Sequence, residues 1–100
     1  MGVTFRTARL QRCYEGQAAA QRAWGAAVAR KYVERINLLH ACQTLQDLAA
    51  FPQLRLHPLK GVRKGQYALA LDARMRLIVT VRGTPPTRIR IEEVSRHYGD

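Results

Sequence analysis

The first half of the chain carries apolar residues at helical spacing. Every third or fourth position between residues 24 and 39 is apolar, so these side chains fall on one face of a helix. The apolar positions are Trp24, Val28, Tyr32, Ile36 and Leu39. We expect the helix to run from Gln17 to Ala41 and to be weakened only slightly by Gly25.

Shorter elements flank this helix. Alternation at Val3–Phe5 predicts an edge strand, and Ala8–Tyr14 predicts a short helix that ends at Gly16. Thr44 and Asp47 have the spacing of a capping box, which predicts another short helix through residue 50. Two prolines then bracket an irregular or edge segment, namely Pro52 and Pro58.

The second half alternates between apolar and polar residues, as strands with one buried face do. The apolar positions are Tyr67, Leu69, Leu71, Met75, Leu77, Val79, Val81, Ile89 and Ile91. Turns are expected at residues 72–74 and 83–86, and the last strand reaches at most Glu93. This order predicts an α+β fold, with N-terminal helices packed on one face of a small antiparallel sheet. We expect residues 1–100 to form one domain.

Arginines lie out of phase with the apolar positions of these strands. They are Arg74, Arg76, Arg82, Arg88 and Arg90. We expect them to project from the open face of the sheet or its margin. Lys and Arg outnumber Asp and Glu by 17 to 7, for a net charge of +10. A surface of this charge typically meets nucleic-acid phosphate or a strongly acidic protein, and a merely solvated basic face is the alternative.

Other features narrow the class of function. Cys13 and Cys42 lack metal-ligand spacing and are expected to be reduced thiols. No signal peptide or membrane-spanning run is found, which favours a soluble, cytoplasmic protein. No zinc motif or glycine-rich phosphate loop is present, so no metal or cofactor is expected. Glu92 and Glu93 are neighbours on a strand and are therefore expected on opposite faces, which excludes a carboxylate pair.

Two segments combine histidine with cations. One lies at residues 56–64 and holds His57, Lys60, Arg63 and Lys64. The other lies at the C-terminal end and holds Arg96, His97 and Tyr98. Together they would supply the base, the cations and the acid that metal-free RNA cleavage needs, because histidine titrates near neutral pH. His40 is expected to be a structural or surface residue, and Tyr67 and Tyr98 are candidate base-stacking residues.

The run LHPLKGVRKGQYALAL, followed four residues later by RLIVTV, resembles the RelE/ParE superfamily of bacterial type II toxins. The resemblance is strongest to the HigB-type branch, the plasmid maintenance system killer proteins, and covers nearly the whole chain. It implies a RelE-like fold and a toxin that cleaves mRNA in the ribosomal A site. It also implies a cognate antitoxin, a HigA-type helix-turn-helix protein, that would form a hetero-oligomer with the toxin. No membrane partner is implied.

The resemblance implies roles for particular residues. His57, Lys60, Arg76 and His97 match the catalytic positions of the family, and Arg63 matches a basic position common in the branch. The two histidines would share acid–base work, while the cations would hold the scissile phosphate. The remaining phosphate-binding candidates are Lys64, Arg74, Arg88, Arg90, Arg96 and Tyr98.

The chain departs from the HigB-type signature at its last strand. Ser95 and Arg96 stand where the branch has aspartate and tyrosine. Two alternatives therefore stay open beside the ribonuclease. One is a ParE-type inhibitor of DNA gyrase that cuts no RNA, and the other is a catalytically weakened RNA-binding member.

Overall fold

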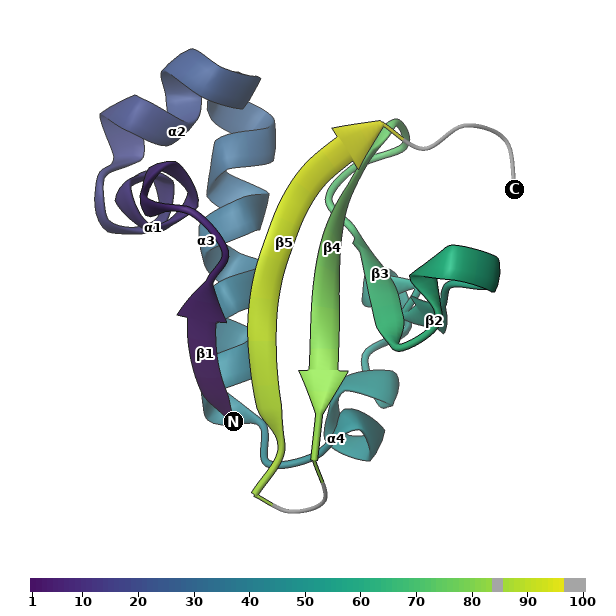
Figure 1. Ribbon diagram of the computed structural model, residues 1–100. Coiled ribbons are helices and arrows are strands. Elements are labelled where there is room, and N and C mark those ends of the chain that lie inside the picture. Colours follow the sequence, from purple (N-terminus) through teal and green to yellow (C-terminus); the bar gives the residue numbers. More distant parts are fainter. Residues whose placement is uncertain (84–85, 97–100) are drawn as a thin grey trace.

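The computed structural model describes residues 1–83 and 86–96, which form a five-stranded sheet with helices on one face (Figure 1). The strands are β1 (Gly2–Phe5), β2 (His57–Pro58), β3 (Gln66–Ala70), β4 (Met75–Arg82) and β5 (Arg88–Arg96). The helices are α1 (Ala8–Glu15), α2 (Gln17–Trp24), α3 (Ala26–Ala41) and α4 (Leu45–Ala49). Two short 3-10 turns complete the fold, η1 (Pro52–Leu54) and η2 (Gly61–Arg63).

The sheet has the strand order β1-β5-β4-β3-β2. The meander of β2 to β5 is antiparallel as predicted, while β1 pairs in parallel with β5, a pairing that the prediction of a small antiparallel sheet did not include. Nearly the whole chain separates β1 from β5, and such a long connection allows a parallel pair that a tight turn forbids. The predicted edge strand at Val3–Phe5 is confirmed.

The predicted helix from Gln17 to Ala41 is split in two at Gly25, so the expectation of one continuous helix is wrong. Gly25 has φ 83° and ends α2 while it begins α3. A residue with a side chain rarely adopts this backbone conformation, so the glycine at position 25 is the local reason for the break in the helix. The break lets Trp24 and Tyr32 pack with their ring centroids 4.6 Å apart.

The other predicted helices are confirmed. α1 ends at Gly16, and Thr7 caps its beginning by accepting a hydrogen bond from the Leu10 amide. α4 begins with a complete capping box, in which Thr44 accepts from the Asp47 amide and Asp47 accepts from the Thr44 amide. The segment between the two prolines contains η1 and the edge strand β2, as predicted.

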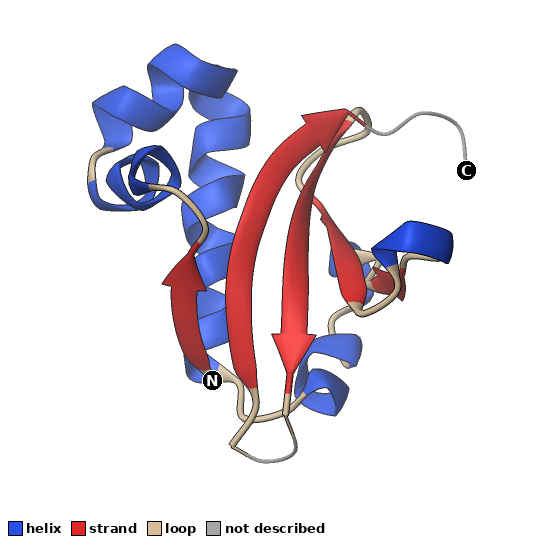
Figure 2. Ribbon diagram, viewed as in Figure 1, coloured by secondary structure: helices blue, strands red, loops and turns tan. Residues whose placement is uncertain are grey.

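The main core lies between the helices and the sheet. In Figure 1, α3 passes behind the sheet, with α1 and α2 at one end and α4 at the other, and Figure 2 shows the same layers by type. Tyr32, Ile36 and Leu39 from α3 are fully buried with Leu69 and Leu77 from the strands. Thus the predicted apolar stripe of the helix and the predicted apolar phase of the strands meet. Among the described residues, no helix is both long and apolar enough to cross a membrane.

Candidate active site

Strand pairing fixes which residues share the sheet face opposite α3, here called the open face. His57 pairs with Ala68, and Ala68 pairs with Ile78, so these three side chains lie in one row. The neighbouring row places Arg76 opposite Ser95. The sheet therefore brings the loop histidine and the strand arginine to the same face, as the sequence predicted for Arg76.

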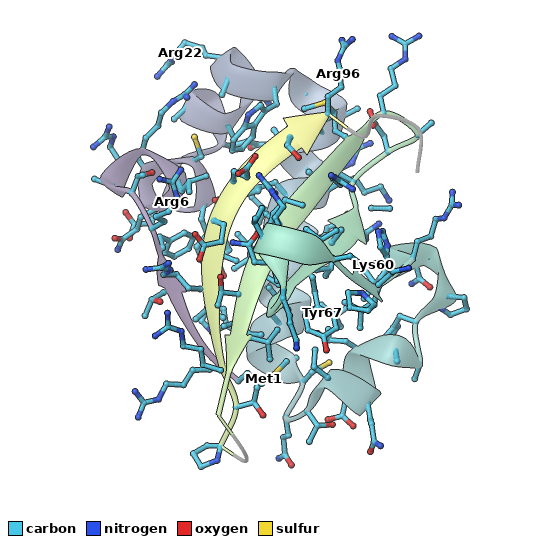
Figure 3. All side chains as sticks on the ribbon, turned by 45° about the vertical axis from the view of Figure 1, so that its right-hand side comes forward. Met1, Arg6, Arg22, Lys60, Tyr67 and Arg96 are labelled. Atoms are coloured by element: carbon cyan, nitrogen blue, oxygen red, sulfur yellow. The ribbon has the colours of Figure 1, made fainter. Side chains whose placement is uncertain are left out.

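The segment from Leu59 to Gly65 folds over part of this face. Leu59 forms a second small apolar cluster with Ala68 and Ile78, separate from the main core. Figure 3 shows the short turn η2 in front of the sheet, with Lys60 labelled beside it. The open face is therefore partly covered by the same loop that carries the predicted cations.

The loop cations are not equivalent. A terminal nitrogen of Arg63 lies 3.2 Å from a carboxylate oxygen of Glu93, so this arginine is engaged across the face by an acid. Lys60 and Lys64, at the two ends of η2, are exposed. The described residues thus offer Lys60 and Lys64 to an incoming anion more directly than Arg63.

A β-bulge in β5 changes the position of its two carboxylates. The register with β4 shifts so that Ile78 pairs with Glu93 while Val79 pairs with Ile91, which leaves Glu92 as the extra residue. Glu92 accepts a hydrogen bond from Thr80 on the open face, and Glu93 contacts Arg63 there. The prediction that the two glutamates point to opposite faces is wrong, because alternation fails at a bulge.

A cavity of about 200 Å³ opens beside β2, β3 and β4. Its lining includes Arg55, His57, Ala68, Ala70, Asp72 and Arg76. Two predicted site residues, His57 and Arg76, therefore meet in one pocket. Sequence reasoning missed Arg55 and Asp72, although Arg55 stands only two positions before His57 in the basic loop.

The hydrogen bonding of His57 defines its chemistry. Its Nδ1 lies 3.0 Å from the carbonyl oxygen of Arg55. A carbonyl can only accept, so Nδ1 carries the proton and Nε2 of the neutral ring keeps a lone pair. Arg55 holds this carbonyl in place with a left-handed backbone, φ 47°, which is uncommon outside glycine. His57 is therefore set up to take a proton through Nε2.

The base of the pocket is held by hydrogen bonds to the backbone. Buried Arg35 donates through Nε to the carbonyl of Ala70 at the end of β3, at 2.9 Å. In the following turn, Asp72 accepts from the amides of Arg74 and Met75 at 2.8 and 2.6 Å. These contacts fix the turn from β3 to β4 and thus the position at which Arg76 begins its strand.

The end of β5 lies next to this pocket. Ser95 pairs with Arg76, and Arg96 pairs with Met75. Within residues 1–83 and 86–96, the buried Ser95 hydroxyl has no hydrogen-bond partner. His97 and Tyr98 lie outside the described residues, so their meeting with His57 stays a prediction.

The remaining predicted residues spread over the sheet. Arg74 is exposed in the turn before β4, and Arg96 is exposed at the tip of β5 (Figure 3). Arg88 is exposed near the far end of β5, while Arg90 binds Glu92 at 2.7 Å. Tyr67 packs against the main core, so its suggested role in base stacking is wrong, since it shares the phase of Leu69.

No group of three or more His, Cys, Asp or Glu side chains that could hold a metal is found in the described part of the chain. The other predicted histidine, His40, is exposed and lies 6.0 Å from Tyr14, ring centroid to ring centroid. It is a surface residue on α3, as predicted.

Solved structures with the same fold include a YoeB/ParE toxin from Agrobacterium tumefaciens, with 23% identity, a TM-score of 0.58, and coverage of 98% of this chain and 100% of that chain. YafQ from E. coli has 17% identity and a TM-score of 0.64 over 94% of this chain and 90% of its own. YoeB of Staphylococcus aureus, solved with YefM, has 20% identity and a TM-score of 0.53 over 98% of both chains. No protein-family model and no curated protein matches this sequence. The expected α+β, RelE-like fold is confirmed.

Proposed function

We propose that this chain is the toxin of a type II toxin–antitoxin system, of HigB type, and that it cleaves mRNA in the ribosomal A site. The observation that carries the proposal is the pocket in which His57, with its Nδ1 held by the Arg55 carbonyl, lies beside Arg76 and Arg55. The fold shared with YoeB/ParE toxin and YafQ, together with the LHPLKG resemblance, supports the same class.

In this proposal His57 acts first as a general base. Nε2 takes the proton of a ribose 2′-OH, and the 2′-oxygen attacks the adjacent phosphorus. Arg76 and Arg55 neutralise the negative charge that builds on the non-bridging oxygens. The bond to the 5′-oxygen then breaks, which leaves a 2′,3′-cyclic phosphate, and the 5′-oxygen takes a proton from an acid. The family resemblance implies that His57 and His97 share the acid–base work, and in this proposal His97 supplies that proton.

The exposed cations around the pocket would hold the RNA strand. Lys60 and Lys64 project from η2, Arg74 lies in the turn before β4, and Arg96 ends β5. Cations on rigid elements position a strand without reading its bases. Arg63 would contribute only after it exchanges Glu93 for phosphate, because the two now form an ion pair.

The protein partner in this proposal is an antitoxin, and the site of action is the cytoplasm. YoeB of Staphylococcus aureus is solved in complex with YefM, which supports a protein partner for a chain of this fold. A net charge of +10 would steer an acidic partner toward the open face. The HigA-type identity of that partner rests on the sequence resemblance.

Substitution of the pocket residues tests the proposal. We expect His57→Gln and Arg76→Lys each to lower mRNA cleavage on translating ribosomes, at least about 100-fold and about 10-fold respectively, because they remove the base and the bidentate cation. His40→Gln, an exposed histidine on α3, is the matched control and should cleave at the normal rate. Full activity of both pocket variants, with melting temperatures unchanged, would refute the assignment.

The ParE-type alternative makes the opposite prediction. Inhibition of DNA gyrase in vitro, without any cleavage of ribosome-bound mRNA by the wild-type chain, would replace the ribonuclease proposal. His57→Gln would then leave the inhibition unchanged, because a binding surface needs no proton acceptor.

A further inference from the structure

The bulge residue Glu92 organises a group of side chains that the cleavage mechanism above does not use. Glu92 is 4% exposed, and its Oε2 accepts hydrogen bonds from Thr80 Oγ1 at 2.6 Å and from Arg90 Nε at 2.7 Å. Arg6 Nε donates to the Glu92 carbonyl oxygen at 2.9 Å and lies 3.6 Å from Oε1 of the carboxylate. One buried acid thus anchors two arginines, Arg6 directly after β1 and Arg90 within β5.

The charges in this group do not balance. Burial on its own raises the pKa of Glu92, but the hydrogen bonds from Thr80 and Arg90 and the charges of Arg90 and Arg6 together hold it below its ordinary value. Glu92 is therefore ionised, and it compensates one of the two arginine charges. A net positive charge is left on the open face.

Both arginines are anchored through Nε, which leaves their terminal guanidinium nitrogens available to a ligand. Each contacts Glu92 through Nε, and their side chains remain 51% and 46% exposed for Arg6 and Arg90. Within residues 1–83 and 86–96, no hydrogen bond or ion pair engages the terminal nitrogens of either guanidinium. A fixed guanidinium with free terminal N–H groups is the arrangement that binds phosphate oxygens in pairs.

A cavity lined by arginines lies next to Glu92 and its partners. This cavity of about 460 Å³ is lined by Thr4, Arg82, Arg88 and Arg90, and no acidic residue of the described chain lines it. Thr80 and Arg90 form a pair four residues along β4 from the pair of Arg76 and Ser95. At about 3.3 Å per residue, the two pairs are about 13 Å apart on the same face.

This position favours RNA over an acidic protein segment as the ligand. The segment with η2 covers the sheet face between the two pairs, because Leu59 packs on Ile78. A strand of RNA with one phosphate in the His57 pocket would therefore reach Arg90 by passing over η2, where Lys60 and Lys64 are exposed. We propose that Arg6 and Arg90, oriented by Glu92, form a second phosphate-binding subsite for the RNA backbone. The subsite rests on the proposed ribonuclease function for the identity of its ligand.

RNA binding without ribosomes tests the subsite separately from cleavage. A fluorescent single-stranded RNA of about 12 nucleotides, long enough to cover several phosphate contacts, is titrated with wild-type chain, Arg6→Gln and Arg90→Gln at several NaCl concentrations. We expect each variant to bind about fivefold more weakly and to lower the slope of log affinity against log salt by about 0.7, the value for one lost contact to a single strand. Arg22→Gln, an exposed arginine on α2 away from the sheet, is the matched control (Figure 3).

The control variant separates a loss of RNA affinity that is specific to the subsite from one that follows from the lower net charge. The subsite is refuted if Arg6→Gln and Arg90→Gln bind RNA no more weakly than Arg22→Gln, or if the wild-type chain does not bind the RNA. It is equally refuted if a poly-glutamate peptide, and not RNA, shows the dependence on Arg6 and Arg90. Arg6→Lys and Arg90→Lys keep the net charge and should still weaken binding, and an unchanged melting temperature in each variant excludes unfolding as the cause.

Cleavage and binding can fail independently of each other. If the Arg6 and Arg90 variants lose RNA affinity while the wild-type chain never cuts mRNA on ribosomes, the subsite is supported and the ribonuclease proposal is refuted. If these variants bind RNA with normal affinity while the wild-type chain does cut mRNA on ribosomes, the subsite is refuted and the ribonuclease proposal stands.

Discussion

At the scale of single residues, individual contacts determine what several charged and polar side chains can do. The carbonyl of Arg55 decides which nitrogen of His57 is protonated, and Glu93 decides that Arg63 spans the open face. Glu92 has the largest set of partners, with two arginines and a hydroxyl around one buried carboxylate. Its contribution to stability is therefore open to a direct test.

We expect the stability of the wild-type chain to depend on pH through Glu92. Its pKa is lowered in the folded state, so its stabilising contribution is complete above the unfolded-state pKa of about 4.3 and is lost as the pH falls through the lower folded value. Urea unfolding from neutral pH down to about one unit below that unfolded-state pKa should show a steeper loss of unfolding free energy for wild type than for Glu92→Gln. Parallel curves for the two proteins would contradict the ionised network.

At the scale of elements, backbone conformation decided two features that side-chain patterning could not. The apolar stripe from Trp24 to Leu39 continues through Gly25, yet the helix does not, because the glycine takes φ 83°. Likewise, the alternation of β5 is interrupted at Glu92 by a bulge. The predicted helical period is correct on both sides of Gly25. Beyond the bulge, however, the phase of β5 shifts, and the strand continues to Arg96, past its predicted end at Glu93.

Gly25→Ala should destabilise the fold by about 1–3 kcal/mol, because an L-residue is strained at this positive φ with an extended ψ. Gly2→Ala is the control, since its β-carbon would meet no atom within 4 Å and its φ is not positive. Urea unfolding measures both. A gain in stability for Gly25→Ala would mean that α2 and α3 can join as one helix.

At the scale of the whole molecule, charge and topology act together. A net charge of +10 on 100 residues opposes compactness, and ion pairs such as Arg63–Glu93 and Arg90–Glu92 offset only part of it. The parallel pairing of β1 with β5 places Arg6 beside Glu92, 86 residues away in sequence. The sheet thus concentrates cations on one face.

We expect NaCl to raise the melting temperature. Between about 0.01 and 0.15 M salt the screening length falls from about 30 Å to about 8 Å, which weakens the repulsion between surface cations more than it weakens the partly buried ion pairs. Thermal unfolding followed by circular dichroism should show a rise of a few degrees, roughly what 1 kcal/mol produces in a domain of this size. A fall in melting temperature would show that attractive pairs outweigh the net repulsion.

The sequence by itself determined the elements whose signals are local. The periods of α3 and of the strands, the capping box at Thr44, and the place of Arg76 on the open face were all predictable, because each depends on a few neighbouring residues or on alternation. The α+β class followed from the order of these elements.

Only the tertiary structure decided which distant groups meet. The contact of Arg63 with Glu93, the parallel β1–β5 pair, and the anchoring of Arg6 by Glu92 join residues at least 30 positions apart. No local pattern encodes such contacts, since they arise from strand register and from a bulge that one residue creates. The loop His57–Lys64 thus carries its chemistry in its sequence, while the sheet decides which of its cations remain available to an anion.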